Sequence, residues 1–201
     1  FSTITFTDPN VKVACTGDIR TLLDWRNYST VNTQNARFCY LFKDCAVLTS
    51  APELPAKELA DNCYSGMFSG CTSLTAAPEL KATTLARSCY SSMFNGCTSL
   101  EKAPELKATT LVESCYESMF NGCTKLTSVT MLAPSDQISQ ATYCCYNWLY
   151  NAGTDETVTS RTLIVTDEAA YNELESNTNY LPAIWKKDAT NTTVEYYTPK
   201  T

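Results

Sequence analysis

Apolar and polar positions along this chain follow a pattern that repeats every 26 residues. The sequence Met-Phe-x-Gly-Cys-Thr begins at Met67, Met93 and Met119, and a looser copy begins 26 residues earlier at Leu41. Two further motifs recur at the same interval, Cys-Tyr before this sequence and Ala-Pro-Glu-Leu after it. Self-similarity at one fixed period is typical of tandem repeats, in which each unit buries its apolar face against its neighbours.

Within one unit the apolar positions predict a helix followed by a short strand. Leu85, Cys89 and Met93 fall four residues apart and are followed by Gly96, which favours an apolar helix face with a glycine at its end. The proline of Ala-Pro-Glu-Leu should end a brief strand, because proline cannot donate to a sheet. The alternating residues 128–131 predict the best strand of the array.

Less regular segments flank the repeats and are expected to cap them. Residues 1–36 predict an N-terminal helical cap, in which Asp8 and Pro9 start a short helix. The repeat array spans residues 37–153, and residues 154–201 predict a C-terminal α/β cap made from a degenerate last unit. Within this last cap the pattern predicts a strand, a helix capped by threonine and a second strand, at 162–165, 166–175 and 193–197.

The three repeated motifs together resemble BspA-like leucine-rich repeats of Bacteroides-type cell-surface proteins. The resemblance covers roughly residues 1–153, and Ala-Pro-Glu-Leu replaces the usual aliphatic-rich strand in three of the four units. It implies an α/β fold, a right-handed leucine-rich-repeat solenoid of about four 26-residue units with N- and C-terminal caps. It also implies a surface lipoprotein, exported and lipid-anchored through a segment upstream of Phe1, with a role in adhesion.

Composition narrows the function mainly by exclusion. The chain has 201 residues, no histidine, and 15 basic against 21 acidic residues, which gives a net charge of −6. The lack of histidine excludes Ser-His, Cys-His and His-metal sites within the chain, and the acidic balance argues against nucleic-acid binding. No Gly-x-Ser-x-Gly, P-loop or dinucleotide motif occurs, and no apolar stretch has the length of a membrane span. We therefore expect a non-enzymatic protein with no catalytic residue, cofactor or metal site.

Eleven cysteines are present, and most of them recur with the repeat. Their regular spacing predicts small buried residues at tight corners rather than metal ligands. Disulfides such as Cys89 to Cys97 are the alternative in an exported protein, although helix direction sets the two sulfurs apart. In the adjacent pair Cys144 and Cys145 we expect one thiol to point outward, which makes Cys144 the candidate for a reactive or intermolecular thiol.

Solvent-facing strand positions are the candidate binding surface for a protein ligand. Repeat proteins of this kind bind partners along the extended face of their stacked units. The small and mostly uncharged side chains there predict a modest polar interface. The candidates are Thr49, Ser50, Thr75, Ala76, Glu101, Lys102, Thr127 and Ser128.

Two other sets of repeated residues leave alternatives open. Stacked Tyr64, Tyr90 and Tyr116 could present rings to a sugar or a peptide, or could cover the helix flank with their hydroxyls in water. An acidic ladder beside lysines could be bridged by calcium, although a solvated edge in which lysines offset the repulsion is the favoured explanation. Its members are Glu53, Glu79, Glu105, Lys81 and Lys107. A glycan-binding module and a structural spacer in a longer surface lipoprotein therefore stand beside protein binding as hypotheses.

Overall fold

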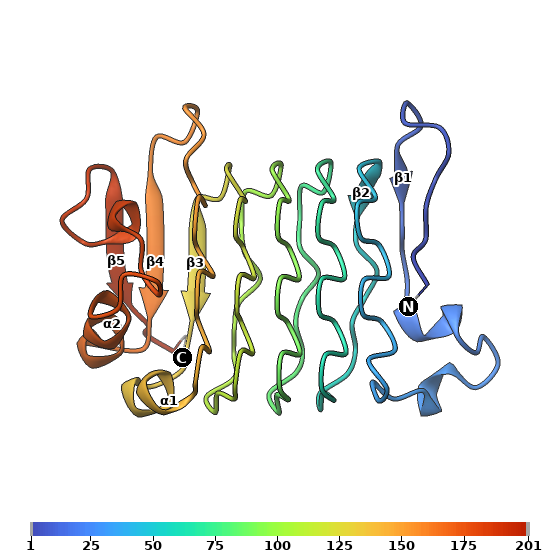
Figure 1. Cartoon of the computed structure of the whole chain (residues 1–201), viewed down its shortest axis with the longest axis horizontal. Coiled ribbons are helices and arrows are strands. Elements are labelled where there is room, and N and C mark those ends of the chain that lie inside the picture. Colours follow the sequence, from blue (N-terminus) through green and yellow to red (C-terminus); the bar gives the residue numbers. More distant parts are fainter. Residues whose placement is uncertain (1, 200–201) are drawn as a thin grey trace.

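The chain runs in narrow coils that stand side by side from its N-terminal to its C-terminal end (Figure 1). This computed structural model describes residues 2–199. Phe1, Lys200 and Thr201, which fall in the two predicted caps, lie outside the described residues. Regular helices are few and short. They are the α-helices α1 (Ser135–Gln140) and α2 (Glu168–Glu175) and the 3₁₀ helices η1 (Ile19–Leu22), η2 (Tyr28–Thr30) and η3 (Ala183–Trp185).

Two short parallel sheets lie toward the two ends of the molecule. At the N-terminal end β1 (Val13–Ala14) pairs with β2 (Leu48–Ser50). At the C-terminal end β3 (Ser128–Met131), β4 (Arg161–Val165) and β5 (Thr192–Tyr196) form a sheet in the order β3-β4-β5. Isolated parallel bridges between neighbouring coils extend this pairing, so the strand segments of successive coils run side by side in one direction (Figure 1).

The predicted α/β leucine-rich-repeat solenoid, with a helix in every unit, is wrong. Within residues 2–199 the α-helices are limited to α1 and α2, and the sheets have only two and three strands. In the segment where the spacing predicts a helix, residues 87–96 form consecutive turns in which Ser88, Ser92 and Gly96 have positive φ. A right-handed helix does not accommodate left-handed residues at every fourth position.

Backbone hydrogen bonds show why turns replace the helix. The N–H of Tyr90 donates to the Cys115 carbonyl at 3.1 Å, in the next coil, whereas the N–H of Ser91 donates to the Ser88 carbonyl at 3.2 Å. This alternation between the next coil and three residues back continues along the first four such segments, and in the last one Asn147 donates its N–H onward to the Asn179 carbonyl. An α-helix would direct every N–H four residues back and would leave no donor for the neighbouring coil. We call these segments the turn ribbons, at residues 36–45, 62–71, 88–97, 114–123 and 143–152.

Equivalent side chains of successive turn ribbons form the core. Phenylalanine rings stack with centroids 5.6–5.7 Å apart, and tyrosine rings with centroids 6.0 and 6.2 Å apart. Buried methionines and cysteines fill the space beside these rings. Offset stacking of this kind adds a favourable quadrupole interaction to the burial of apolar area. The stacked residues are Phe42, Phe68, Phe94 and Phe120, and Tyr64, Tyr90 and Tyr116.

The C-terminal segment closes the end of this core. The predicted strands at 128–131, 162–165 and 193–197 are confirmed to within one residue as β3, β4 and β5. The predicted helix at 166–175 forms as α2, although its N-cap is Asp167, whose carboxylate accepts the N–H of Ala170 at 2.9 Å, rather than Thr166. Carboxylates are good N-caps because they satisfy free N–H groups of the first turn.

The N-terminal segment is less helical than predicted. No helix follows Asp8 and Pro9. Instead Val13 donates its N–H to the Val47 carbonyl at 3.0 Å and enters β1. The backbone donors of this segment are used by the neighbouring coil, as they are in the turn ribbons. A short 3₁₀ helix, η1, is capped by Asp18, whose side chain accepts the N–H of Arg20.

Candidate functional site

The eight strand-face candidates lie on the strand segments of successive coils, and all are at least partly exposed. Thr75, Ala76, Glu101 and Lys102 are exposed, whereas Thr49, Ser50, Thr127 and Ser128 are half-buried. Hydroxyls at both ends of the row bond to the neighbouring coil. Thr49 Oγ1 donates to the Val13 carbonyl at 3.0 Å, and Thr127 Oγ1 donates to the Glu101 carbonyl at 2.8 Å. The most accessible candidates are therefore those of the two middle coils.

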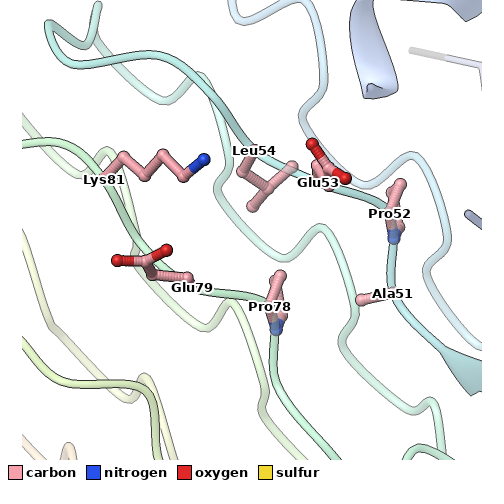
Figure 2. Close-up of a pocket in the computed structure, with 7 residues that line it drawn as sticks. All are labelled: Ala51, Pro52, Glu53, Leu54, Pro78, Glu79 and Lys81. Carbon is pink, nitrogen blue, oxygen red and sulfur yellow. The ribbon is translucent and has the colours of Figure 1, made fainter. Parts of the chain in front are cut away.

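A hollow of about 320 Å³ opens close to these candidates, where Ala-Pro-Glu-Leu of two coils lies side by side (Figure 2). Apolar side chains and three charged groups line it together. Figure 2 shows Lys81 extending its ammonium toward the coil that carries Glu53 and Leu54. The lining residues are Ala51, Pro52, Glu53, Leu54, Pro78, Glu79 and Lys81.

The repeated Ala-Pro-Glu-Leu segments of successive coils, with the lysines that directly follow two of them, form a charged edge of the molecule. Charge pairing along this edge differs from one coil to the next. Lys107 Nζ lies 2.9 Å from Glu79 Oε1, and this bond lowers the pKa of Glu79 and raises that of Lys107. The equivalent pair one coil earlier, Lys81 with Glu53, is not among the ion pairs within residues 2–199. The hollow thus holds an ammonium and a carboxylate, both solvent-exposed, that do not neutralise each other in direct contact.

The charged edge continues into the N-terminal coil. Arg20 Nη2 lies 2.7 Å from Asp18 Oδ2. The hydrogen bonds that Arg20 donates hold the pKa of Asp18 below its ordinary value. Backbone bonds fix this coil beside the hollow, since Glu53 donates its N–H to the Gly17 carbonyl at 2.8 Å. The edge therefore presents charges of both signs in fixed positions on neighbouring coils.

The calcium alternative gains no support from the geometry of the acidic ladder. Across the described part of the chain, no three carboxylate or thiol side chains come close enough to share a metal ion. Glu79 is instead paired with Lys107. The ladder is a charged edge in which lysine offsets carboxylate repulsion.

The three tyrosines proposed as a glycan platform lie inside the molecule. Tyr64, Tyr90 and Tyr116 are only 1%, 2% and 1% exposed, so their rings do not reach a sugar and their hydroxyls do not extend into bulk water. Burial raises the pKa of each phenol. The hydroxyl of Tyr64 is the buried side-chain polar atom without a hydrogen-bond partner in the described residues. These rings belong to the core.

The cysteines of the repeats are buried and unpaired, as their regular spacing predicts, and only Cys144 lies differently. All eleven are free thiols, so the alternative disulfide between Cys89 and Cys97 is not formed. Cys144 and Cys145 are both fully buried, which makes the prediction of an outward-pointing Cys144 wrong. Adjacent residues are usually directed to opposite sides only in a strand, and this pair lies in a turn ribbon. Cys15 is the one partly exposed cysteine of the eleven.

Sequence reasoning identified the charged residues of the hollow but missed its apolar walls. Pro52 and Pro78 were interpreted as strand ends, although their recurrence in each unit signals that they lie side by side.

No helix in residues 2–199 combines the length and apolar character needed to cross a membrane. Comparison of the chain with protein-family models, with curated proteins and with solved structures gave no match. The resemblance to BspA-like repeats thus rests on the repeated motifs.

Proposed function

We propose that the chain is a non-enzymatic interaction module that binds a protein ligand through the strand segments of its coils. The hollow at Glu53, Glu79 and Lys81 is the centre of the interface, and the strand-face candidates form its surroundings. The observation that carries the proposal is the pair of exposed, opposite charges, Lys81 and Glu53, held on neighbouring coils beside proline walls. A location at the cell surface, through export and a lipid anchor, is part of the proposal and rests on the resemblance.

A protein ligand fits this hollow better than a glycan. Protein interfaces combine apolar contact with a polar surround and use complementary charge for specificity. Half-buried Ala51 and Pro78 supply the apolar contact, with buried Pro52 and Leu54 behind them, and charges of both signs stand around the hollow. Sugar binding usually relies on an exposed aromatic face, and the tyrosine column is buried in the core.

The state of the thiols supports a non-enzymatic role. Cysteine acts as a nucleophile only as the thiolate, and burial in apolar surroundings opposes ionisation. Burial raises the pKa of both Cys63 and Cys115 to about 12. Cys144 differs, because a hydrogen bond from the Cys145 thiol lowers its pKa, but its side chain is fully buried. Ten of the eleven cysteines are buried, so these side chains serve packing rather than attack on a substrate.

Binding to purified matrix proteins, measured by biolayer interferometry, tests the proposal. We expect the full chain to bind at least one of fibronectin, laminin, fibrinogen and type I collagen, and to leave a glycan array silent. Lys81→Glu should weaken that binding about tenfold, because a charge pair at an interface centre typically contributes about 1.5 kcal/mol or more. Lys187→Glu, an exposed lysine of the C-terminal segment, is the matched control and should leave binding unchanged.

The same measurements separate the alternatives. A responding glycan array with silent matrix proteins would replace the proposal by glycan binding. Matrix binding that is indifferent to Lys81→Glu would move the interface away from the hollow. A chain that binds none of the probes would favour the structural spacer.

A further inference from the structure

A second hollow, of about 270 Å³, lies between two turn ribbons near the C-terminal end of the repeats. Glu117, Tyr143 and Tyr146 line it. The two rings meet edge to face, with centroids 5.4 Å apart and planes at 73°. The N–H of Ser118 donates to the Tyr146 carbonyl at 2.8 Å, which fixes the ribbon that carries Glu117 against the ribbon that carries the rings.

All three lining residues depart from the repeat. The inter-coil hydrogen bonds place Tyr143 opposite Ser114, and earlier units have Ser88 and Asn62 at this position. Glu117 likewise follows Ser91 and Ser65 of the earlier units. Small polar residues of the earlier ribbons are thus replaced here by a carboxylate and two aromatic rings.

Packing does not account for Tyr143. Its φ is +54°, in the left-handed region that bulky residues adopt at a cost, and its side chain is 55% exposed. The small residues at this position in earlier coils meet the same backbone demand with less strain. Backbone strain kept at an exposed aromatic residue is a reason to look for a function there.

Four other aromatic rings of the chain are covered by cationic groups of the protein itself. Four contacts of this kind have cation-to-centroid distances of 4.9–5.7 Å. They join Arg26 to Trp25, Lys187 to Tyr171, Lys43 to Tyr40 and Arg20 to Tyr28. Within residues 2–199, no lysine or arginine lies over Tyr143 or Tyr146, and the charged group beside them is the Glu117 carboxylate.

We propose that Glu117, Tyr143 and Tyr146 form a binding site for an alkylammonium cation. The open ring face beside the hollow attracts a compact cation, and the Glu117 carboxylate supplies the opposite charge. The chemistry recognised is a methylated ammonium, carried either by the side chain of a methylated lysine or by free choline. This site shares no residue with the hollow at Lys81, so either proposal stands without the other.

Isothermal titration calorimetry on the full chain tests the site with choline and with 3,3-dimethylbutan-1-ol, its neutral isostere. We expect choline to bind in the millimolar range or tighter, and the neutral alcohol to bind at least about tenfold more weakly, because cation–π attraction requires the charge. Acetyl-trimethyllysine amide forms the second arm. Tighter binding of this probe than of choline assigns the site to a protein side chain, and the reverse assigns it to the free cation.

Two variants and a control connect the binding to these residues. Glu117→Gln keeps the shape of the side chain and should weaken choline binding about fivefold. Tyr143→Ser, which installs the residue of the preceding coil, should weaken it about tenfold and leave the fold intact. Tyr150→Asn removes a tyrosine of similar exposure, 52%, from the same turn ribbon and installs the residue of Asn121. This control should bind choline like the parent chain.

Equal binding of the neutral alcohol would overturn the proposal, since shape rather than charge would then be recognised. Unchanged choline binding by Tyr143→Ser, with a thermal melt that shows a folded chain, would also overturn it. The edge-to-face pair would then be a structural contact between neighbouring ribbons.

Discussion

Cys97 shows what a single residue contributes to each corner of the stacked coils. Its thiol is completely buried and donates to the Phe68 carbonyl of the preceding coil at 3.1 Å. Cys71 and Cys123 make the same contact with their preceding coils at 3.1 and 3.0 Å. Cysteine suits this position because it is small and apolar and yet carries a weak donor.

Thiol accessibility gives a first prediction at this scale. In the native chain we expect Ellman's reagent to modify Cys15 alone on the time scale of minutes, because the ten other cysteines are buried. In guanidinium chloride all eleven should react, since none is in a disulfide. Rapid native labelling of several thiols would contradict the burial of the cysteine columns.

The same burial predicts a loss of stability at alkaline pH. The pKa of Cys63 and of Cys115 rises from 9.0 to about 12 on folding. The unfolded chain loses these protons above pH 9 while the folded chain keeps them, so the stabilisation is complete below pH 9 and is lost as the pH rises toward 12. Two such groups lower the free energy of unfolding by about 2.7 kcal/mol per pH unit in that range.

Urea unfolding in reductant at pH 7.5, 9 and 10 measures this effect. The urea concentration at the unfolding midpoint should be lower at pH 10 than at pH 9. A Cys63→Ala, Cys115→Ala double variant should show a smaller fall than the parent chain. Equal midpoints of the parent chain at pH 7.5 and 10 would show that these thiols are not buried as neutral groups.

The turn ribbon is the element that the apolar spacing alone does not identify. Its buried residues come in adjacent pairs at a strict interval of four, such as Cys89 with Tyr90 and Met93 with Phe94. Over a segment this short, a period of four is hard to distinguish from the helical period of 3.6. Serine, asparagine and glycine recur at the left-handed positions, and their poor helix propensity was the available signal against a helix.

Glycine substitution distinguishes a turn ribbon from a helix by the sign of its effect. Ser92 and Ser118 have φ of +55° and +52°. Ser92→Gly and Ser118→Gly should therefore leave the free energy of unfolding unchanged or raise it by about 1 kcal/mol, because glycine adopts this conformation without strain. In a helix each change would instead cost about 0.5–1 kcal/mol.

Thermal and urea unfolding of these variants measures the sign directly. Ser91→Gly, at a neighbouring position outside the left-handed set, is the control and should destabilise the chain. Destabilisation by all three variants to a similar extent would favour a helix in these segments.

At the scale of the whole molecule, the repeat length fixes which side chains meet. Phe68 and Phe94 stack with centroids 5.6 Å apart because they are 26 residues apart in the sequence, one complete coil. Each coil bonds to its immediate neighbours, as the inter-coil hydrogen bonds show. In repeat proteins stability is approximately a sum of such neighbour contacts.

Removal of one complete unit should therefore preserve the fold. Deletion of residues 72–97 places Phe68 opposite Phe120 and keeps every later residue in register. We expect a folded chain with a thermal midpoint lower by several degrees, because one interface between coils is lost. Deletion of residues 85–97 removes a turn ribbon but keeps its strand segment, and should abolish cooperative unfolding. Similar loss of structure in both deletions would show that the coils do not stack independently.

The sequence predicted part of the proposed binding surface, and the structure decided which of its charged residues are paired. The ladder containing Glu53, Glu79 and Lys81 was visible because it recurs with the repeat. That Lys107 pairs with Glu79 while Lys81 stays exposed depends on how neighbouring coils are offset, which the spacing does not contain. Tyr143 and Tyr146 were overlooked because they break the repeat, and that departure was the signal that could have identified them.

The sequence by itself determined the 26-residue interval, the residues that share a column and the strands near the C-terminal end, because identical spacing forces equivalent side chains together once the coils lie side by side. Only the tertiary structure decided the conformation within each unit. Half of the backbone donors of a turn ribbon bond to the next coil, and this choice depends on a neighbour that no local window includes. Such bonds between coils make consecutive turns more favourable than the helix that each segment, taken alone, predicts.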